Sequence, residues 1–152
     1  MKYLISSLLT ILVLHIYGQT TNELENITVE ILEITNKYNK TWETLDMNQV
    51  AQFHSDSSFR YYRNMELSVA SNEEFRNIYP QYFIRTKSWK LETYDPVVQV
   101  LSSNVAVIGF TGKAELITKD EKVLDIGTGA YTYVWKKIND EWKIAHIHES
   151  AK

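Results

Sequence analysis

The chain has 152 residues, a formal net charge of -3 and no cysteine. The lack of cysteine excludes disulfides, a thiol nucleophile and a thiolate metal site, and mild acidity without a clustered basic face argues against nucleic-acid binding. Aromatic residues make up 12% of the chain and include ten tyrosines, which favours an aromatic core and a pocket with amphipathic walls.

The first 18 residues have the pattern of a signal peptide. Lys2 is the only charge before an apolar run from Leu4 to Tyr17, and that run is too short to span a bilayer comfortably. Small Gly18 precedes a polar stretch, so we expect cleavage between Gly18 and Gln19 and export to the periplasm or the medium. An uncleaved N-terminal anchor is the alternative. The mature chain would not contact the membrane.

Residues 19–152 suit a single domain. They number 134 and carry a net charge of -4, because the removed segment contains one lysine and no acid. Asn22 and Glu25 form a capping box at the start of a long amphipathic helix. Its apolar stripe recurs at spacings of three and four. The stripe consists of Leu24, Ile27, Ile31, Ile34, Tyr38, Trp42 and Leu45.

Two shorter helices follow. Asp46 is the expected cap of a helix from Met47 to His54, and Ser71 with Glu74 forms the capping box of a third. Pro80 should bend that third helix. Its expected buried face consists of Phe75, Ile78 and Tyr82.

The rest of the chain reads as strands. A hairpin is predicted over Phe59–Tyr62 and Met65–Ala70, and from Ser88 the pattern alternates with period two. The four long strands expected there cover residues 89–100, 105–118, 122–137 and 141–149. Glycines at 109, 112, 127 and 129 indicate bulges or sharp curvature in the middle strands. Helices followed by a meander predict an α+β fold, with the helices on one face of a curved antiparallel sheet.

The last hairpin carries a recognisable pattern. Thr132-Tyr133-Val134-Trp135 is followed by a charged turn and then by Trp142, His146, His148 and Ser150. This pattern resembles the last two strands of the nuclear transport factor 2-like superfamily. It is most similar to the SnoaL-like group and to the association domain of calcium/calmodulin-dependent kinase II. The resemblance implies a cone-shaped, cystatin-like fold with a pocket at its open end and a homodimer formed through the sheet.

The superfamily hosts many functions, so the site must be argued from its residues. Ketosteroid isomerases use a carboxylate base with a tyrosine and a protonated acid. The resemblance places Tyr38 at the tyrosine position. The base position falls on Tyr61 or Tyr62 and the acid position near Tyr131, so the isomerase site is not predicted.

The kinase association domain has a pocket lined by arginines that suit carboxylate ligands. The matching positions lie near Gly112 and Tyr133, so an arginine clamp is not predicted either. The expected pocket is aromatic and neutral-polar, and its expected ligand is a small apolar or carbonyl-containing molecule. The candidate ligand-binding residues are Tyr38, Trp42, Tyr61, Tyr131, Tyr133 and Trp135.

The candidate catalytic residues are Asp56, His146 and His148. Strand alternation puts both histidines on one face with Trp142. If that face lines the cone, the imidazoles could exchange a proton near neutral pH, with Asp56 as a general base. In the alternative, one histidine is structural and the other contacts a partner subunit, while Asp56 caps a serine-rich turn.

His146 and His148 could also chelate a metal with a third ligand such as His54, Asp56 or Glu149. Nothing in the sequence fixes the position of that third ligand, so we expect neither a metal nor a cofactor. Two functions therefore remain. One is a small-molecule-binding domain with weak proton-transfer activity of the lyase or isomerase kind. The other is a non-catalytic interaction module in which the sheet forms a dimer.

Overall fold

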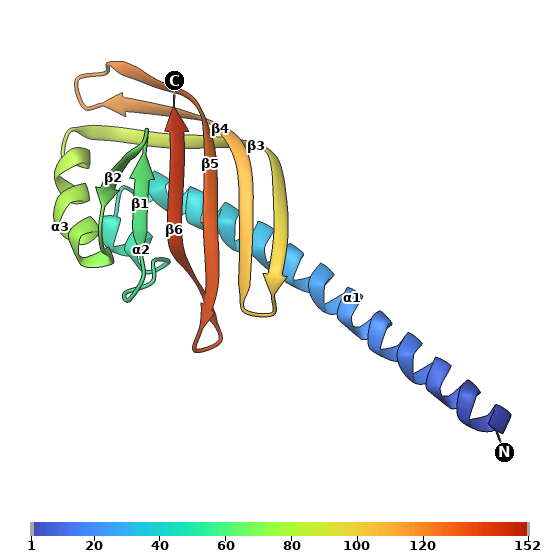
Figure 1. The fold of residues 1–152 in the computed structure, drawn as a ribbon. Coiled ribbons are helices and arrows are strands. Elements are labelled where there is room, and N and C mark those ends of the chain that lie inside the picture. The colour runs from blue at the N-terminus through green and yellow to red at the C-terminus, as the bar shows by residue number, and fades with distance from the viewer. Residues whose placement is uncertain (1, 152) are drawn as a thin grey trace.

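The computed structural model describes the backbone of residues 2–151 and the side chains of residues 21–124 and 127–151. The helices are α1 (Lys2–Thr41), α2 (Met47–Ala51) and α3 (Asn72–Phe83), with a short 3-10 turn η1 (Trp42–Thr44) after α1. The strands are β1 (Arg60–Arg63), β2 (Glu66–Val69), β3 (Thr86–Ser102), β4 (Val105–Thr118), β5 (Val123–Ile138) and β6 (Glu141–Ala151). The helices lie on one side of a curled sheet, with α1 crossing it and extending beyond it (Figure 1).

The six strands form one sheet in the order β2-β1-β6-β5-β4-β3. Strands β3 to β6 form the predicted antiparallel meander. Strand β1 pairs with β6 in parallel, so the sheet is mixed and the expectation of a purely antiparallel sheet was wrong. The reason is that no hairpin joins β1 to β6, so nothing forces them to run in opposite directions. The predicted α+β class is confirmed.

Helix α1 begins at Lys2, so Asn22 lies inside the helix and does not cap its start as predicted. Neither of the two prolines in the chain falls in this segment, so nothing breaks the helix there. The expected signal peptide, residues 1–18, lies outside the described side chains. In the part of the chain with described side chains, no helix is both long and apolar enough to cross a bilayer.

The predicted caps of the two short helices are confirmed. The Asp46 carboxylate accepts from two backbone N–H groups at the start of α2, and Ser71 accepts from the Glu74 N–H at the start of α3. The expected burial of Tyr82 was wrong, because its side chain is 70% exposed. The buried face of α3 runs instead through Asn72 and Phe75, which are one helical turn apart.

Strand β6 contains one irregularity that decides which residues face the core. Ile144 pairs with Trp135 and His146 pairs with Val134, so Ala145 has no partner on β5. This arrangement is a β-bulge, in which one extra residue reverses the inward and outward alternation beyond it.

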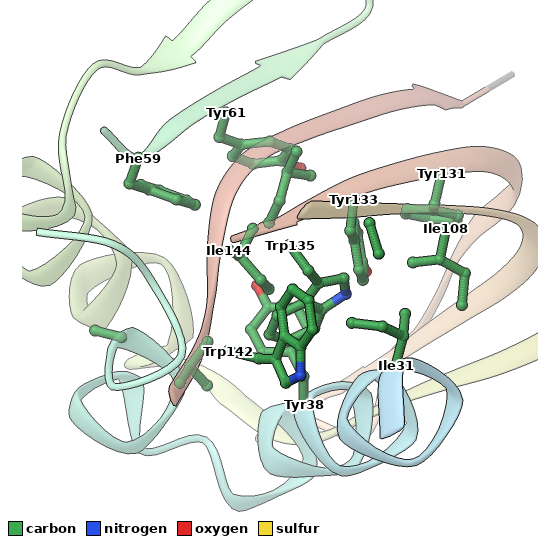
Figure 2. Close-up of a cluster of buried hydrophobic side chains, with 14 of the residues drawn as sticks. Ile31, Tyr38, Phe59, Tyr61, Ile108, Tyr131, Tyr133, Trp135, Trp142 and Ile144 are labelled. Atoms are coloured by element: carbon green, nitrogen blue, oxygen red, sulfur yellow. The ribbon is translucent and has the colours of Figure 1, made fainter. Parts of the chain in front are cut away.

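Helix α1 packs against the concave face of the sheet, with Ile31 and Tyr38 pointing into the buried cluster (Figure 2). Ile31 is fully buried there. The Trp135 indole N–H donates to Thr35 Oγ1 at 3.0 Å, and the Tyr133 hydroxyl donates to Asn39 Oδ1 at 3.2 Å. These bonds satisfy buried polar groups that would otherwise destabilise the core, and they fix the helix over β5.

Candidate functional site

A cavity of about 380 Å³ opens between the end of α1, helix α3 and the concave face of the sheet. Most of its wall is aromatic, with rings contributed by both helices and by β1, β3 and β5. Trp42 lies among several of these rings, with its centroid 5.8 Å from that of Phe75 and 5.7 Å from that of Tyr79. Aromatic rings at such distances attract each other edge to face, so they form a firm wall.

Two charged residues, Glu149 and Arg63, interrupt this apolar surface. Glu149 lines the cavity on β6, and only 7% of the residue is exposed. It accepts a short hydrogen bond from the Tyr61 hydroxyl, and its Oε1 lies 3.3 Å from the Nε of Arg63. The parallel pairing of β1 with β6 sets Arg63 directly opposite Glu149. A buried carboxylate is costly unless it is paired in this way.

Tyr131 lies across from Glu149 on the neighbouring strand. Its ring packs over two glycines that pair with each other, Gly112 and Gly129. A Cβ at Gly112 would lie 3.1 Å from Cε2 of the tyrosine ring, and one at Gly129 would lie 3.3 Å from the same atom. These glycines therefore make room for the ring. Gly127, with a φ of 89°, adjoins a register shift and matches the expected bulge.

The tyrosine hydroxyls around the cavity are protonated at neutral pH. Burial raises the pKa of Tyr131 to about 12. Burial is also the main cause that raises the pKa of Tyr38, Tyr61, Tyr79 and Tyr133. Each hydroxyl thus has one proton to donate and an oxygen that can accept.

Behind the cavity, a chain of hydrogen bonds runs from Tyr38 through His54 to Asn72. The Asn72 amide nitrogen donates to Asp56 Oδ1 at 2.7 Å and to the Ala51 carbonyl at 3.1 Å. Both partners only accept, so the Asn72 oxygen must face His54 Nδ1, 3.2 Å away. The histidine therefore carries its proton on Nδ1, and its bare Nε2 accepts from the Tyr38 hydroxyl at 3.0 Å.

His54 is neutral in this setting. It is 2% exposed, and its ring stacks on Phe59 with centroids 3.8 Å apart. Burial lowers the pKa of His54 to about 3. Asp56 accepts a hydrogen bond from Asn72 and does not line the cavity, so the pocket position, one of the two alternatives for this residue, is not the one observed.

The structure places the six candidate ligand-binding residues unequally. Five of them, Tyr38, Trp42, Tyr61, Tyr131 and Tyr133, line the cavity. Trp135 is fully buried in the core below it. That these residues bind a ligand remains a prediction.

The sequence left open whether His146 and His148 face the cone, and the structure places both on the outer face. Because of the bulge at Ala145, Ile147 and Glu149 point inward beyond it, while His148 is exposed on the outer face. His146 stacks on Tyr62 at 5.3 Å, and partial burial, with a contribution from His148, lowers its pKa. Among the described side chains, no three His, Asp or Glu gather as a metal site.

Sequence reasoning missed Arg63 and considered Glu149 only as a metal ligand. The predicted hairpin strands, Phe59–Tyr62 and Met65–Ala70, leave Arg63 in the turn between them, although it is the last residue of β1 and the turn lies at Asn64 and Met65. The bulge that points Glu149 inward has no glycine to mark it. The sequence signal that was available for the pair was their opposite charge at strand ends, but only the pairing of β1 with β6 joins them.

Comparison with known proteins places the fold. The SnoaL-like domain family matches residues 31–152. The chain belongs to the SnoaL-like family. No curated protein matches this SnoaL-like chain.

Solved structures similar to the SnoaL-like domain share its fold at low identity. A nuclear transport factor 2-like superfamily protein from Salmonella enterica is 22% identical with a TM-score of 0.72, over 84% of this chain and 92% of that one. The association domain of C. elegans calcium/calmodulin-dependent kinase II is 15% identical with a TM-score of 0.67, over 84% and 97%.

A third similar protein, from Novosphingobium aromaticivorans, is named provisionally as a scytalone dehydratase. It is 10% identical with a TM-score of 0.77, over 87% of this chain and 88% of that one. At such identities these likenesses show the fold alone. They confirm the predicted nuclear transport factor 2-like architecture.

The neutral His54 makes stability depend on pH. The unfolded chain binds a proton on this histidine below its ordinary pKa of 6.5, whereas the folded chain does so only near 3. The contribution of neutral His54 to stability is therefore fully present above pH 6.5 and is lost as the pH drops from 6.5 towards 3. We expect the free energy of unfolding to fall by about 2 kcal/mol between about pH 7 and pH 5 because of this histidine. Urea unfolding of the wild type and of His54→Gln would measure the difference.

The matched control for this experiment is His148→Gln, because His148 is exposed on the outer face. That variant should keep the wild-type dependence on pH. An equal loss of stability in His54→Gln and in the wild type would contradict a buried neutral histidine.

Proposed function

We propose that this chain is an exported small-molecule-binding domain of the SnoaL-like type, with weak proton-transfer activity in its cavity. The observation that carries the proposal is a carboxylate, Glu149, held inside a mostly aromatic cavity. Burying such a group destabilises a fold unless it is compensated. A functional role explains why it lies there rather than at the surface.

The size and chemistry of the cavity support binding. Its volume of about 380 Å³ lies in the range of small-molecule pockets, which are mostly apolar with a few placed polar groups. Here the apolar part is a set of aromatic rings, and the polar part is Glu149 with Tyr61 and Arg63. The transfer of an apolar molecule from water to such a wall lowers the free energy and so favours binding.

Proton transfer is supported by the same carboxylate. A general base must reach the proton that it removes within hydrogen-bond distance, and Glu149 presents a carboxylate to any ligand in the cavity. The Tyr61 hydroxyl and the Arg63 guanidinium hold it in place. Two structural neighbours are named provisionally as dehydratases, a reaction class that removes a proton. In this proposal Glu149 takes the role first considered for Asp56 and the two outer histidines.

Binding is tested by a thermal-shift screen of the purified protein against sterols, lipids and small ring compounds. A ligand at about 100 times its dissociation constant should add about 2.7 kcal/mol of stability and raise the melting temperature in a saturable way. Ala114 is buried in the cavity wall, so Ala114→Phe should fill the cavity and remove the shift.

His148→Phe is the control for the screen, because the same kind of ring is added on the outer face. The proton-transfer part is checked by measuring the turnover of a ligand found in the screen. Glu149→Gln should lower its rate by at least about 100-fold at saturating ligand. A flat screen, or a shift that survives in Ala114→Phe, would remove the cavity from the proposal.

Export is proposed from residues 1–18 alone, whose single lysine precedes an apolar run. We expect a mature protein that begins at Gln19 when the chain is produced in a host that exports it. Intact-mass measurement of the exported product would show this cut. A product that keeps residues 1–18 and stays with the membrane would support the alternative of an uncleaved anchor.

A second role, self-association, is favoured by the outer face of the sheet. Tyr94 and Val97 on β3 are 43% and 69% exposed, and Val107 and Val134 pair beside each other on the same face. Exposed apolar side chains on a sheet face are candidates for contact with another protein surface. We infer a homodimer formed through it, as the sequence resemblance implied. Such a dimer is compatible with ligand binding, because the cavity opens on the opposite face.

The homodimer is tested by Val97→Lys, which places a charge among the exposed apolar side chains of this face. Light scattering after gel filtration should report a dimer for the wild type and a monomer for the variant, since a buried unpaired charge opposes association. Leu67→Lys, on the far edge strand β2, should remain a dimer. A wild-type protein that is already monomeric would rule this role out.

A further inference from the structure

The protons of three cavity hydroxyls are already used within the protein. Tyr61 donates to Glu149, and Tyr133 donates to Asn39 Oδ1. Tyr38 donates to the bare Nε2 of His54, as the fixed amide of Asn72 requires. A hydroxyl has one proton, so these three groups have only their oxygen lone pairs left for a ligand.

Glu149 is a further group in the cavity that can accept hydrogen bonds from a ligand but cannot donate one. A carboxylate accepts hydrogen bonds and donates none. It receives a hydrogen bond from Tyr61 and forms an ion pair with Arg63, which leaves further lone pairs on its two oxygens. Because the residue is only 7% exposed, water reaches it poorly, and a ligand that brings a donor would satisfy it.

Arg63 does not reverse this balance. Its guanidinium is engaged by Glu149 through Nε, and its side chain is 43% exposed. It lies at the end of β1, where the cavity meets solvent. The guanidinium of Arg63 is therefore paired with Glu149 and exposed to solvent, whereas the carboxylate of Glu149 is buried.

Tyr131 supplies the complementary group. It pairs with Glu149 across β5 and β6, and it lines the cavity. Its hydroxyl has no hydrogen-bond partner among the described residues and keeps its proton, since burial raises its pKa to about 12. A ligand oxygen placed between the two residues could donate to Glu149 and accept from Tyr131.

Given the binding function proposed above, we propose that the ligand of this cavity is an apolar ring compound with a hydroxyl group, an alcohol or a phenol, whose O–H donates to Glu149. A hydroxyl both donates and accepts, so it matches Glu149 and Tyr131 together. A ketone or an ether oxygen only accepts, so it brings no proton for the free lone pairs of the carboxylate. This inference replaces the carbonyl-containing ligand considered from the sequence, and it makes the ligand proton nearest the base the one to be transferred.

The proposal is tested with three aromatic probes of matched shape, β-naphthol, its methyl ether and acetylnaphthalene. Calorimetric titration of the purified protein at neutral pH should give a dissociation constant for naphthol at least about tenfold lower than for the other two, the order expected for one hydrogen bond to a charged group. All three probes are small enough for a cavity of this volume.

The variant Glu149→Gln tests the assignment to this carboxylate. Its amide can donate, so the preference for naphthol should fall to less than about threefold while the ether and the ketone bind as well as before or better. Glu141→Gln is the matched control, because it makes the same change on the same strand at a side chain that is 71% exposed. The control should keep the tenfold preference.

The outcomes separate this inference from the function on which it rests. Equal binding of the three probes, or tighter binding of the ketone, overturns the hydroxyl preference and leaves a binding cavity in place. A preference that persists in Glu149→Gln overturns the role of the carboxylate. If none of the three probes binds, both the proposed function and this inference fail.

Discussion

The bulge at Ala145 is the feature on which the character of the cavity depends. Before it, Ile144 and Trp142 on β6 face the core, and after it the inward positions are Ile147 and Glu149. Strict alternation along this strand would have placed an imidazole in the cavity and the carboxylate outside. One extra residue therefore replaces an imidazole in the cavity wall by a carboxyl group, and the strand stays paired with β5 on either side of it.

The remaining polar groups follow from the need to compensate that carboxylate. Strand β1 joins the sheet in parallel beside β6 and brings Tyr61 and Arg63 to Glu149. Buried charges are tolerated when they are paired and hydrogen-bonded. Helix α3, capped by Ser71, then covers the site with aromatic rings. The short strand, the cap and the ring cluster are thus parts of one arrangement.

A separate polar chain stiffens the wall behind the cavity. His54 stays neutral between the Tyr38 hydroxyl and the Asn72 amide, and Asp56 anchors that amide. Fully satisfied buried networks of this kind make a core specific. The network also sets the direction of the Tyr38 hydroxyl, so a residue that never touches the cavity determines what the cavity offers to a ligand.

The sequence by itself determined the fold class, the two helix caps, the four long strands and five of the aromatic residues that line the cavity. The helices, caps and strands depend on periodicity and capping, which are local properties of neighbouring residues, whereas the cavity positions of Tyr38 and Tyr61 followed from the family resemblance. The sequence did not determine that the histidines face outward, because an unmarked bulge is invisible in an alternating pattern. The pairing of Arg63 with Glu149 was also out of reach, since the two residues are joined only by the parallel contact between strands far apart in the chain. Tertiary structure decided these features, because the direction of a strand and the parity of its side chains are set by its neighbours in the sheet.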